Sequence, residues 1–280
     1  MEVKIAKLLP LPIILISLFL SLSIKNYIDN GEFFIRDLDL KGGTSISFIS
    51  KNEITIDDVS SILGDYGKLA LISISKSEKE YSVRITLPGN VQHDKIIEII
   101  KNSNIETKDF SIQYVGPELG EAFFSQVIYL LSIAYVLIFF ANYFIYRKIA
   151  IALTIILSSL ADIIYVFGVT ILLGIPITFA GFTSLLLVIA YTIDTNILLS
   201  TKILSEKIEE FYSTYKKTLI TGITVTAGLV VSMIIVLVFS NSKLLNNIAT
   251  ILLIGQLADL INTYILNAGL IEVILVGKKR

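Results

Sequence analysis

Three consecutive residues, Asp194, Thr195 and Asn196, have side chains that could carry or relay a proton, and they lie within a long apolar run that begins at Ile177. An ionised Asp near the centre of a membrane-spanning helix costs about 2.5 to 3.5 kcal/mol, so such residues usually face a bundle interior or a water-filled cavity. We therefore predict a functional role for Asp194, with Thr195 and Asn196 beside it. The alternative is structural, because the same side chains could hydrogen-bond a neighbouring span.

Lys202 is the basic residue that follows this group, eight positions after Asp194. That spacing corresponds to about 12 Å along a helix axis, so the two side chains cannot pair directly on one helix. Lys202 is expected to reach the cytoplasmic interface with its ammonium group, and a relay through water between it and Asp194 is the alternative.

Other polar residues recur at helical spacing within apolar runs, which places them on one face of each helix. The stripes consist of Thr154, Ser158, Asp162 and Tyr165 in the third run; Tyr191, Asp194, Leu198 and Thr201, below Ser184, in the fourth; and Gln256, Asp259, Thr263 and Asn267, next to Asn262, in the sixth. Three such stripes predict a polar seam inside the bundle. Interhelical hydrogen bonds average about 0.6 kcal/mol, and we expect the stripe residues of the third and sixth apolar runs, Asn262 included, to be mainly structural.

The composition excludes several classes of protein and site. The chain has 280 residues, 54% of them hydrophobic, a formal net charge of -1 and no cysteine. The charge offers no basic footprint for nucleic acid, and the absence of cysteine excludes disulfides, thiol nucleophiles and cysteine-based metal sites. His93 is the single histidine and lies in a polar turn, where a solvated role is expected. We predict no metal, no organic cofactor and no enzymatic activity, and the sequence lacks the G-x-x-x-x-G-K loop of ATP-driven proteins.

The apolar runs predict a polytopic α-helical membrane protein with six transmembrane helices. The first run extends from Leu8 to about Ile24, longer than an ordinary signal-peptide core, although a cleaved signal is the alternative. The other runs lie near 123–146, 149–173, 177–199, 218–240 and 246–276, and the fifth carries small residues, among them Gly222 and Gly228, that favour close helix packing. We predict a first segment at 1–28, a soluble domain at 29–122 and a five-helix domain at 123–280.

Charged residues in the short loops predict the orientation. Basic residues cluster on the side of both termini, whereas the other side's short loops hold only Lys243; the clustered residues are Lys4, Lys7, Arg147, Lys148, Lys202, Lys207, Lys216, Lys217 and the tail 278–280. The positive-inside rule therefore predicts cytoplasmic termini and an exported soluble domain in the cell membrane. The connector 203–217, rich in Glu, Lys and aromatic residues, is expected to form an amphipathic cytoplasmic helix.

The soluble domain between the first two spans shows alternating strand and helix patterns. Strands are predicted at 45–49, 69–75, 81–87 and 110–115, with a helix from Thr55, the expected N-cap, to about Tyr66, ended by Gly67, and a second helix at 92–102. The middle strands form a hairpin closed by 88–89. The resulting order, βαββαβ, matches the α+β ferredoxin-like split βαβ motif.

Four motifs in this order resemble the SecD/SecF family, membrane subunits that assist the Sec protein-translocation channel, and within it the smaller, SecF type of archaea. Asp39-Leu-Lys-Gly-Gly-Thr44 resembles the family's entry into the exported domain, with Gly42 and Gly43 as its glycines, and Val115-Gly-Pro-Glu-Leu-Gly120 resembles the exit, with Gly116, Pro117 and Gly120. Tyr191–Leu198 resembles the fourth-span motif, with Ala190 where Gly is usual, and Ala258–Gly269 resembles the sixth-span motif.

The resemblance implies a fold of the resistance–nodulation–division superfamily, a SecD partner, contact with the Sec channel, translocating preproteins and membrane lipids, and use of the proton gradient to promote protein export. It also implies that Asp194 is the proton-coupling acid, with Thr195, Tyr191 and Lys202 as further proton-coupling candidates and Lys202 in the place of an Arg. Two other hypotheses remain open. Asp162 and Asp194 could form an intramembrane aspartyl protease, although the G-x-G-D motif is absent, or the chain could be a half-size proton-coupled lipid or drug transporter.

Overall fold

The computed structural model of the chain describes residues 4–68, 70–77, 80–87, 93–103, 105, 107–240 and 242–276. The chain divides into two compact units, one formed by Met1–Ile35 with Val127–Arg280 and the other by Arg36–Gln126. The hairpin end at 88–89 and the basic tail at 278–280 lie outside the described residues, as does the side chain of His93.

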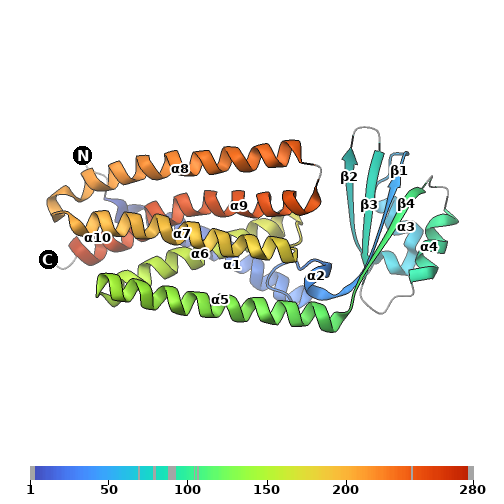
Figure 1. Ribbon diagram of the computed structural model, residues 1–280, viewed down its shortest axis with the longest axis horizontal. Coiled ribbons are helices and arrows are strands. Elements are labelled where there is room, and N and C mark those ends of the chain that lie inside the picture. Colours follow the sequence, from blue (N-terminus) through green and yellow to red (C-terminus); the bar gives the residue numbers. More distant parts are fainter. Residues whose placement is uncertain are drawn as a thin grey trace. The chain divides into compact units, whose positions relative to one another are not determined.

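The first unit is helical (Figure 1) and contains six helices that are long and apolar enough to cross a membrane, as predicted. A short 3-10 helix, η1 (Ile5–Leu8), precedes α1 (Pro10–Asn30). The other spans are α5 (Pro117–Tyr146), which starts in the second unit, α6 (Ile149–Leu173), α7 (Phe179–Ser205), α8 (Phe211–Phe239) and a final span made of α9 (Lys243–Ile261), η4 (Asn262–Asn267) and α10 (Ala268–Val276).

Burial separates inner helices from outer ones. In the most apolar 18-residue stretch of α6 and of α7, 56% and 50% of the residues are buried, against 11% in the corresponding stretches of the spans that contain α1, α5 and α8. The span α9–η4–α10 packs against α6 and α7, and α1 packs along α6. Three spans therefore form the interior of this unit, and their polar residues are the ones that can meet there.

The predicted amphipathic helix at 203–217 is wrong. Helix α7 continues to Ser205, Glu206 and Lys207 adopt extended backbone angles, and a 3-10 turn, η3 (Ile208–Glu210), leads directly into α8. Phe211 is buried among residues of α6, α7 and the last span, with Tyr212 and Tyr215 packed at the edge of the same cluster. These aromatic residues thus anchor the first turns of a span.

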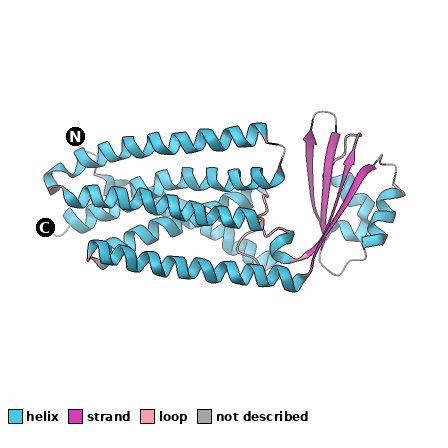
Figure 2. Cartoon of the chain, in the orientation of Figure 1, coloured by secondary structure: helices cyan, strands magenta, loops and turns pink. Residues whose placement is uncertain are grey.

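The second unit is a four-stranded antiparallel sheet covered by helices (Figure 2). Its elements follow in the order α2 (Leu38–Lys41), β1 (Gly43–Ser50), α3 (Ile56–Leu63), η2 (Gly64–Lys68), β2 (Leu71–Ser77), β3 (Glu80–Leu87), α4 (His93–Lys101) and β4 (Thr107–Val115). The strands are ordered β2-β3-β1-β4, so β1 and β3 are central. Apart from the short α2 and η2, this is the βαββαβ order predicted from the sequence.

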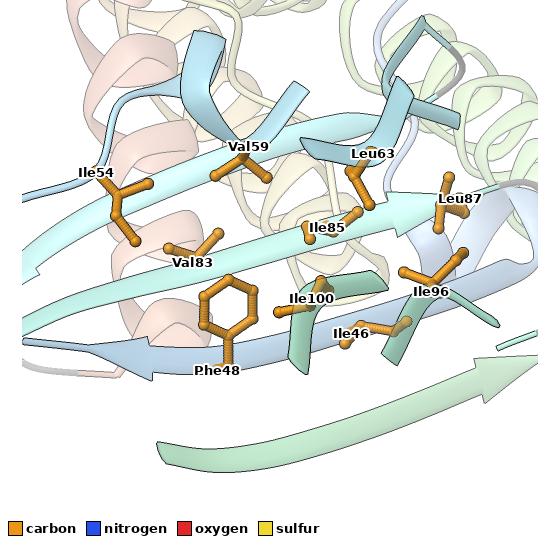
Figure 3. Packing of buried hydrophobic residues seen from close by; sticks show 10 residues of the cluster. All are labelled: Ile46, Phe48, Ile54, Val59, Leu63, Val83, Ile85, Leu87, Ile96 and Ile100. Carbon is orange, nitrogen blue, oxygen red and sulfur yellow. The ribbon is translucent and has the colours of Figure 1, made fainter. Parts of the chain in front are cut away.

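Alternation along the central strands builds the core of this unit. Ile46 and Phe48 of β1 and Val83, Ile85 and Leu87 of β3 point to one face, because side chains alternate along a strand. Val59 and Leu63 of α3 and Ile96 and Ile100 of α4 cover that face, as Figure 3 shows. Two amphipathic helices on one side of the sheet account for this packing.

The start of α3 is as predicted, but its end is not. Thr55 is the N-cap, and Asp58 completes a capping box. The α-helix ends at Leu63 rather than near Tyr66, since Gly64 has a φ of 58°, a left-handed conformation that glycine adopts without steric cost, and a 3-10 turn that includes Gly67 follows.

Acid should weaken this capping box. The Asp58 carboxylate accepts hydrogen bonds from the Thr55 hydroxyl (2.6 Å) and the Thr55 backbone N–H (2.9 Å), which hold the pKa of Asp58 below its usual value. A lowered folded-state pKa gives stability that is present above the unfolded pKa and is lost as the pH falls through the folded one. The measurement is the urea concentration at the midpoint of unfolding of residues 36–116, which should fall between about pH 7 and pH 3. We expect Asp58→Asn to make this fall smaller. Asp57→Asn, in the same helical turn, is the control and should leave it intact.

Candidate functional site

Asp162 lies at the centre of a buried polar network between α6, α7 and the last span. Its side chain is fully buried, and Oδ1 accepts a 2.7 Å hydrogen bond from Asn262 Nδ2 of η4. The other carboxylate oxygen, Oδ2, has no hydrogen-bond partner within the described part of the chain. The sequence stripe in α6 is confirmed as inward-facing, because Thr154, Ser158 and Tyr165 are buried as well.

Asp259 of α9 is the second buried carboxylate, and it interacts electrostatically with Asp162. Thr263 Oγ1 lies 2.6 Å from Asp259 Oδ1, and Thr195 Oγ1 of α7 lies 2.9 Å from both carboxylate oxygens. Thr195 Oγ1 is also 2.9 Å from the backbone oxygen of Thr192. Asp259 thus joins the last span to α7 through two hydroxyl groups.

A third group of polar side chains continues the network along α7. Asn267 Nδ2 donates to Asn196 Oδ1 at 2.6 Å and lies 3.4 Å from Ser200 Oγ, and all three side chains are fully buried. Asn196 Nδ2 donates to the backbone oxygen of Thr192 at 2.7 Å. Gln256, the first member of the predicted sixth-span stripe, is buried too. The stripe from Gln256 to Asn267 therefore lies inside the bundle, as predicted.

A π-helical turn, η4 (Asn262–Asn267), positions the polar residues of the last span. Asn262 reaches Asp162 on α6, whereas its neighbour Thr263 reaches Asp259 and Asn267 reaches α7. π-Turns are rare and often occur at functional sites, because the wider turn changes which side chains share a face. The hydrogen bond from the Tyr215 hydroxyl of α8 to the Tyr264 carbonyl (3.0 Å) engages this turn from outside.

The structure corrects the predicted inward orientation of Asp194. Asp194 is exposed, and so are Tyr191 and Leu198, each 37% exposed, along the same face of α7. The buried face carries Thr192, Asn196 and Ser200 instead. Both faces belong to the same helix, and the packing of α7 against α6 and α9 determines which of them is buried.

The four proton-coupling candidates are consequently divided between two places. Thr195 belongs to the buried network with Asp259, whereas Asp194 and Tyr191 lie on the exposed face. Lys202 is exposed on α7, eight residues after Asp194. The hydroxyl of its neighbour Thr201 lies 2.9 Å from the Tyr146 hydroxyl. The carboxylate that interacts with Asp162 is Asp259, which argues against the Asp162–Asp194 pair of the protease hypothesis.

The glycine motifs meet within the second unit. Gly42, with a φ of 70°, caps the C-terminus of α2, and Gly43, with a φ of 144°, starts β1. Asp39, within α2, is half-buried. A Cβ atom at Gly120 would overlap the backbone nitrogen of Gly42, and one at Gly43 would overlap the carbonyl oxygen of Leu87. Gly116 has open space around it, and Pro117 starts α5. The two motifs therefore allow the chain entering and leaving the sheet to lie in contact.

One buried acid was missed by the sequence analysis. Glu272 of α10 is 2% exposed. Its carboxylate accepts a 2.8 Å hydrogen bond from the Ala6 backbone N–H and a 2.5 Å hydrogen bond from the Tyr212 hydroxyl. It therefore ties the N-terminal 3-10 helix and the start of α8 to the last span. The sequence does contain an indication of this role, since Glu272 is a single acid within the apolar run 270–276.

The side chains of the network carry carboxylate, amide and hydroxyl groups. Among the residues that the structure describes, no group of three or more His, Cys, Asp or Glu side chains could hold a metal ion. Asp259 lies in hydrogen-bonding contact with the Thr195 and Thr263 hydroxyl groups, and Asp162 with the Asn262 amide, so the network contains groups that can bind or pass a proton.

Comparison with known proteins identifies the family. Residues 95–276 match the family model for protein export membrane protein SecD/SecF, C-terminal. SecF of Methanocaldococcus jannaschii is 30% identical over 245 residues, covering 85% of this chain and 86% of the relative, and SecF of Pyrococcus furiosus is 27% identical over 274 residues, covering 97% and 91%.

A solved structure gives the same fold. The crystal structure of SecDF from a Thermus species, a translocon-associated membrane protein, matches with a TM-score of 0.75 at 18% identity, covering 99% of this chain and 38% of the longer one. The family model covers well over half of this chain, and the relatives match most of its length. The chain belongs to the SecD/SecF family of protein-export membrane proteins, and the curated relatives it resembles are SecF proteins.

Proposed function

We propose that this subunit works with a SecD partner to promote protein export through the Sec channel and that it uses the proton gradient across the cell membrane. Membership of the family supports the export role. The SecDF match supports the partner, because this chain corresponds to 38% of that longer chain and leaves room for a second, SecD-like part. Protons are the proposed coupling ion, and translocating preproteins, the channel and membrane lipids are the proposed contacts.

The observation that carries the proposal is the exposed position of Asp194 on α7. A carboxyl group on the outer face of a span is costly against lipid, so a partner surface is expected to cover it. A SecD subunit packed on this face of α7 would shield Asp194 and Tyr191 and could supply the basic group of a proton relay. Lys202, exposed further along the same helix, is the candidate within this chain.

The orientation proposed for the subunit follows from its charges. Arg147, Lys202 and Lys207 lie in or near connections on the side of the N-terminus if the six spans alternate. With both termini cytoplasmic, the unit Arg36–Gln126 lies outside. Its strand order and its two helices on one face of an antiparallel sheet support a ferredoxin-like exported domain.

The test is the substitution Asp194→Asn, which retains size and hydrogen bonding but removes titration. A proton carrier should lose most of the gradient-stimulated export of a Sec substrate in membrane vesicles, whereas a structural residue should tolerate the change. Asp29→Asn, the same chemical change at the exposed end of α1, is the matched control and should export normally.

Co-purification provides the second readout of this experiment. Recovery of SecD with the tagged wild-type chain and with Asp194→Asn separates loss of proton coupling from loss of the partner. Unchanged gradient-stimulated export by Asp194→Asn would place coupling elsewhere. A chain that purifies without SecD or channel components would favour the alternative of a half-size lipid or drug transporter.

A further inference from the structure

The numbers of hydrogen-bond donors and acceptors around Asp259 do not match if this group is ionised. An ionised carboxylate only accepts hydrogen bonds, and each threonine hydroxyl has a single proton to donate. Thr263 directs its proton to Asp259 Oδ1 at 2.6 Å. Thr195 Oγ1 lies 2.9 Å from the Thr192 carbonyl oxygen and 2.9 Å from the Asp259 carboxylate, which are two acceptors for one proton.

One additional proton on Asp259 removes this competition for the Thr195 proton, while the second carboxyl oxygen, Oδ1, stays 2.9 Å from Thr195 Oγ1. The Asp259 hydroxyl then donates to Thr195 Oγ1, Thr195 donates to the Thr192 carbonyl oxygen, and Thr263 still donates to Oδ1. Without that proton, Thr195 would have to share its single proton between the Thr192 carbonyl oxygen and the Asp259 carboxylate. The geometry therefore indicates a protonated carboxyl group at this position.

Unpartnered atoms at Asp162 indicate the same deficiency. Asp162 Oδ2 is buried without a hydrogen-bond partner in the described structure, and so is the hydroxyl of Ser158, one helical turn before it. The Thr192 hydroxyl, fully buried and also without a well-formed hydrogen bond, lies beside the Asp162 carboxylate. Two ionised carboxylates buried close together are costly, and one proton on the pair would reduce that cost.

The helices that hold the two acids supply no positive charge to neutralise them, and the lysines of the neighbouring helices α1 and α8, Lys25, Lys216 and Lys217, are exposed. The sequence contains no Lys or Arg from Ile149 to Thr201, from Pro117 to Tyr146 or from Leu244 to Gly277. The titratable groups that face the pair are tyrosines: Tyr135 of α5 and Tyr165 of α6 interact with Asp162, and Tyr264 of η4 interacts with Asp259. Two buried anions without a cation would each pay a large desolvation cost.

We propose that Asp162 and Asp259 together form a proton-binding site inside this subunit, which holds one exchangeable proton between α6, α7 and the last span. The site is separate from Asp194, which lies on the exposed face of α7. The proposal does not depend on the export function, since proton occupancy can be measured on the isolated protein.

Infrared spectroscopy of the full-length protein in lipid nanodiscs tests the proposal. At neutral pH, the wild type should show the C=O stretch of a protonated, buried carboxylic acid that shifts in D₂O. Asp259→Asn should remove it, and Asp162→Asn should remove or shift it. Asp194→Asn is the matched control and should retain the band of the pair.

A second variant covers the case in which the Asn variants do not fold. Thr195→Val keeps both carboxyl groups and nearly the same volume but removes the acceptor of the Asp259 proton, so it should shift the frequency of the band. A band that Thr195→Val leaves unchanged would overturn the assignment of the proton. The absence of any carboxylic-acid band from the pair would also overturn the proposal. Binding of radioactive ²²Na⁺ that is lost in Asp259→Asn, together with a missing band, would show that the site holds a cation instead of a proton.

Discussion

Gly120→Ala is expected to disrupt the contact between the two glycine motifs and to destabilise the unit Arg36–Gln126 strongly. A Cβ atom at this position would overlap the backbone nitrogen of Gly42 and lie 2.8 Å from the carbonyl carbon of Lys41. Backbone atoms cannot rotate away as a side chain can, and Gly42 is fixed by its role as the cap of α2. Overpacking typically costs about 1 to 3 kcal/mol, and we expect the upper end of that range or more.

The measurement is thermal unfolding of the full-length protein, followed together with protease cleavage within residues 36–126. Gly116→Ala is the matched control, because a Cβ there would meet nothing within 4 Å and its φ is not in the left-handed region. Equal effects of the two substitutions would contradict a specific role for the contact at Gly120 and would indicate a general sensitivity of this segment.

The number of spans and the order of elements in the sheet could be predicted because each depends on patterns local to the sequence. Continuous apolar runs give spans, and alternation in strands such as β1 gives an inner face with Ile46 and Phe48. The end of α3 could not be located as well, because Gly64 and Gly67 are both plausible stops and only the observed φ of 58° at Gly64 decides between them.

The orientation of Asp194 could not be predicted from periodicity alone. Helical spacing shows that Asp194 and Leu198 share a face, but it does not show which neighbour that face meets. Thr192 and Asn196 form an equally regular polar face, and contacts with α6 and α9 bury that one. The assumption that an acid in a span faces the interior of its own chain fails where a partner subunit can cover it.

The π-turn at Asn262–Asn267 is a second feature that sequence patterns do not reveal. It lets Asn262 reach α6 while Asn267 reaches α7, so the network connects three helices through one short segment. The sequence did identify nearly all members of this network as polar residues within spans. Their partners depend on tertiary packing, which determines the Asp162–Asp259 pair.

Gly222→Ala is expected to separate α8 from the π-turn and to destabilise the helical unit. A Cβ atom at Gly222 would overlap the hydroxyl oxygen of Tyr264 and lie 2.5 Å from its Cζ atom. The Tyr264 ring is 1% exposed within the cluster that includes Phe211, and its carbonyl oxygen accepts the hydrogen bond from Tyr215, so the ring has little freedom to move. We expect a loss of about 1 to 3 kcal/mol or more.

A double-variant cycle identifies the cause of this loss. Gly228→Ala, in the same helix and with nothing within 4 Å of the added Cβ, should leave the stability unchanged or slightly higher. Tyr264→Phe removes the overlapping oxygen but leaves Cζ close to the added methyl group, so it should recover part of the loss, and Tyr264→Leu should recover more. Unfolding in mixed detergent micelles gives the coupling energy between positions 222 and 264. Additive effects of the two substitutions would show that Gly222 is required for another reason than contact with Tyr264.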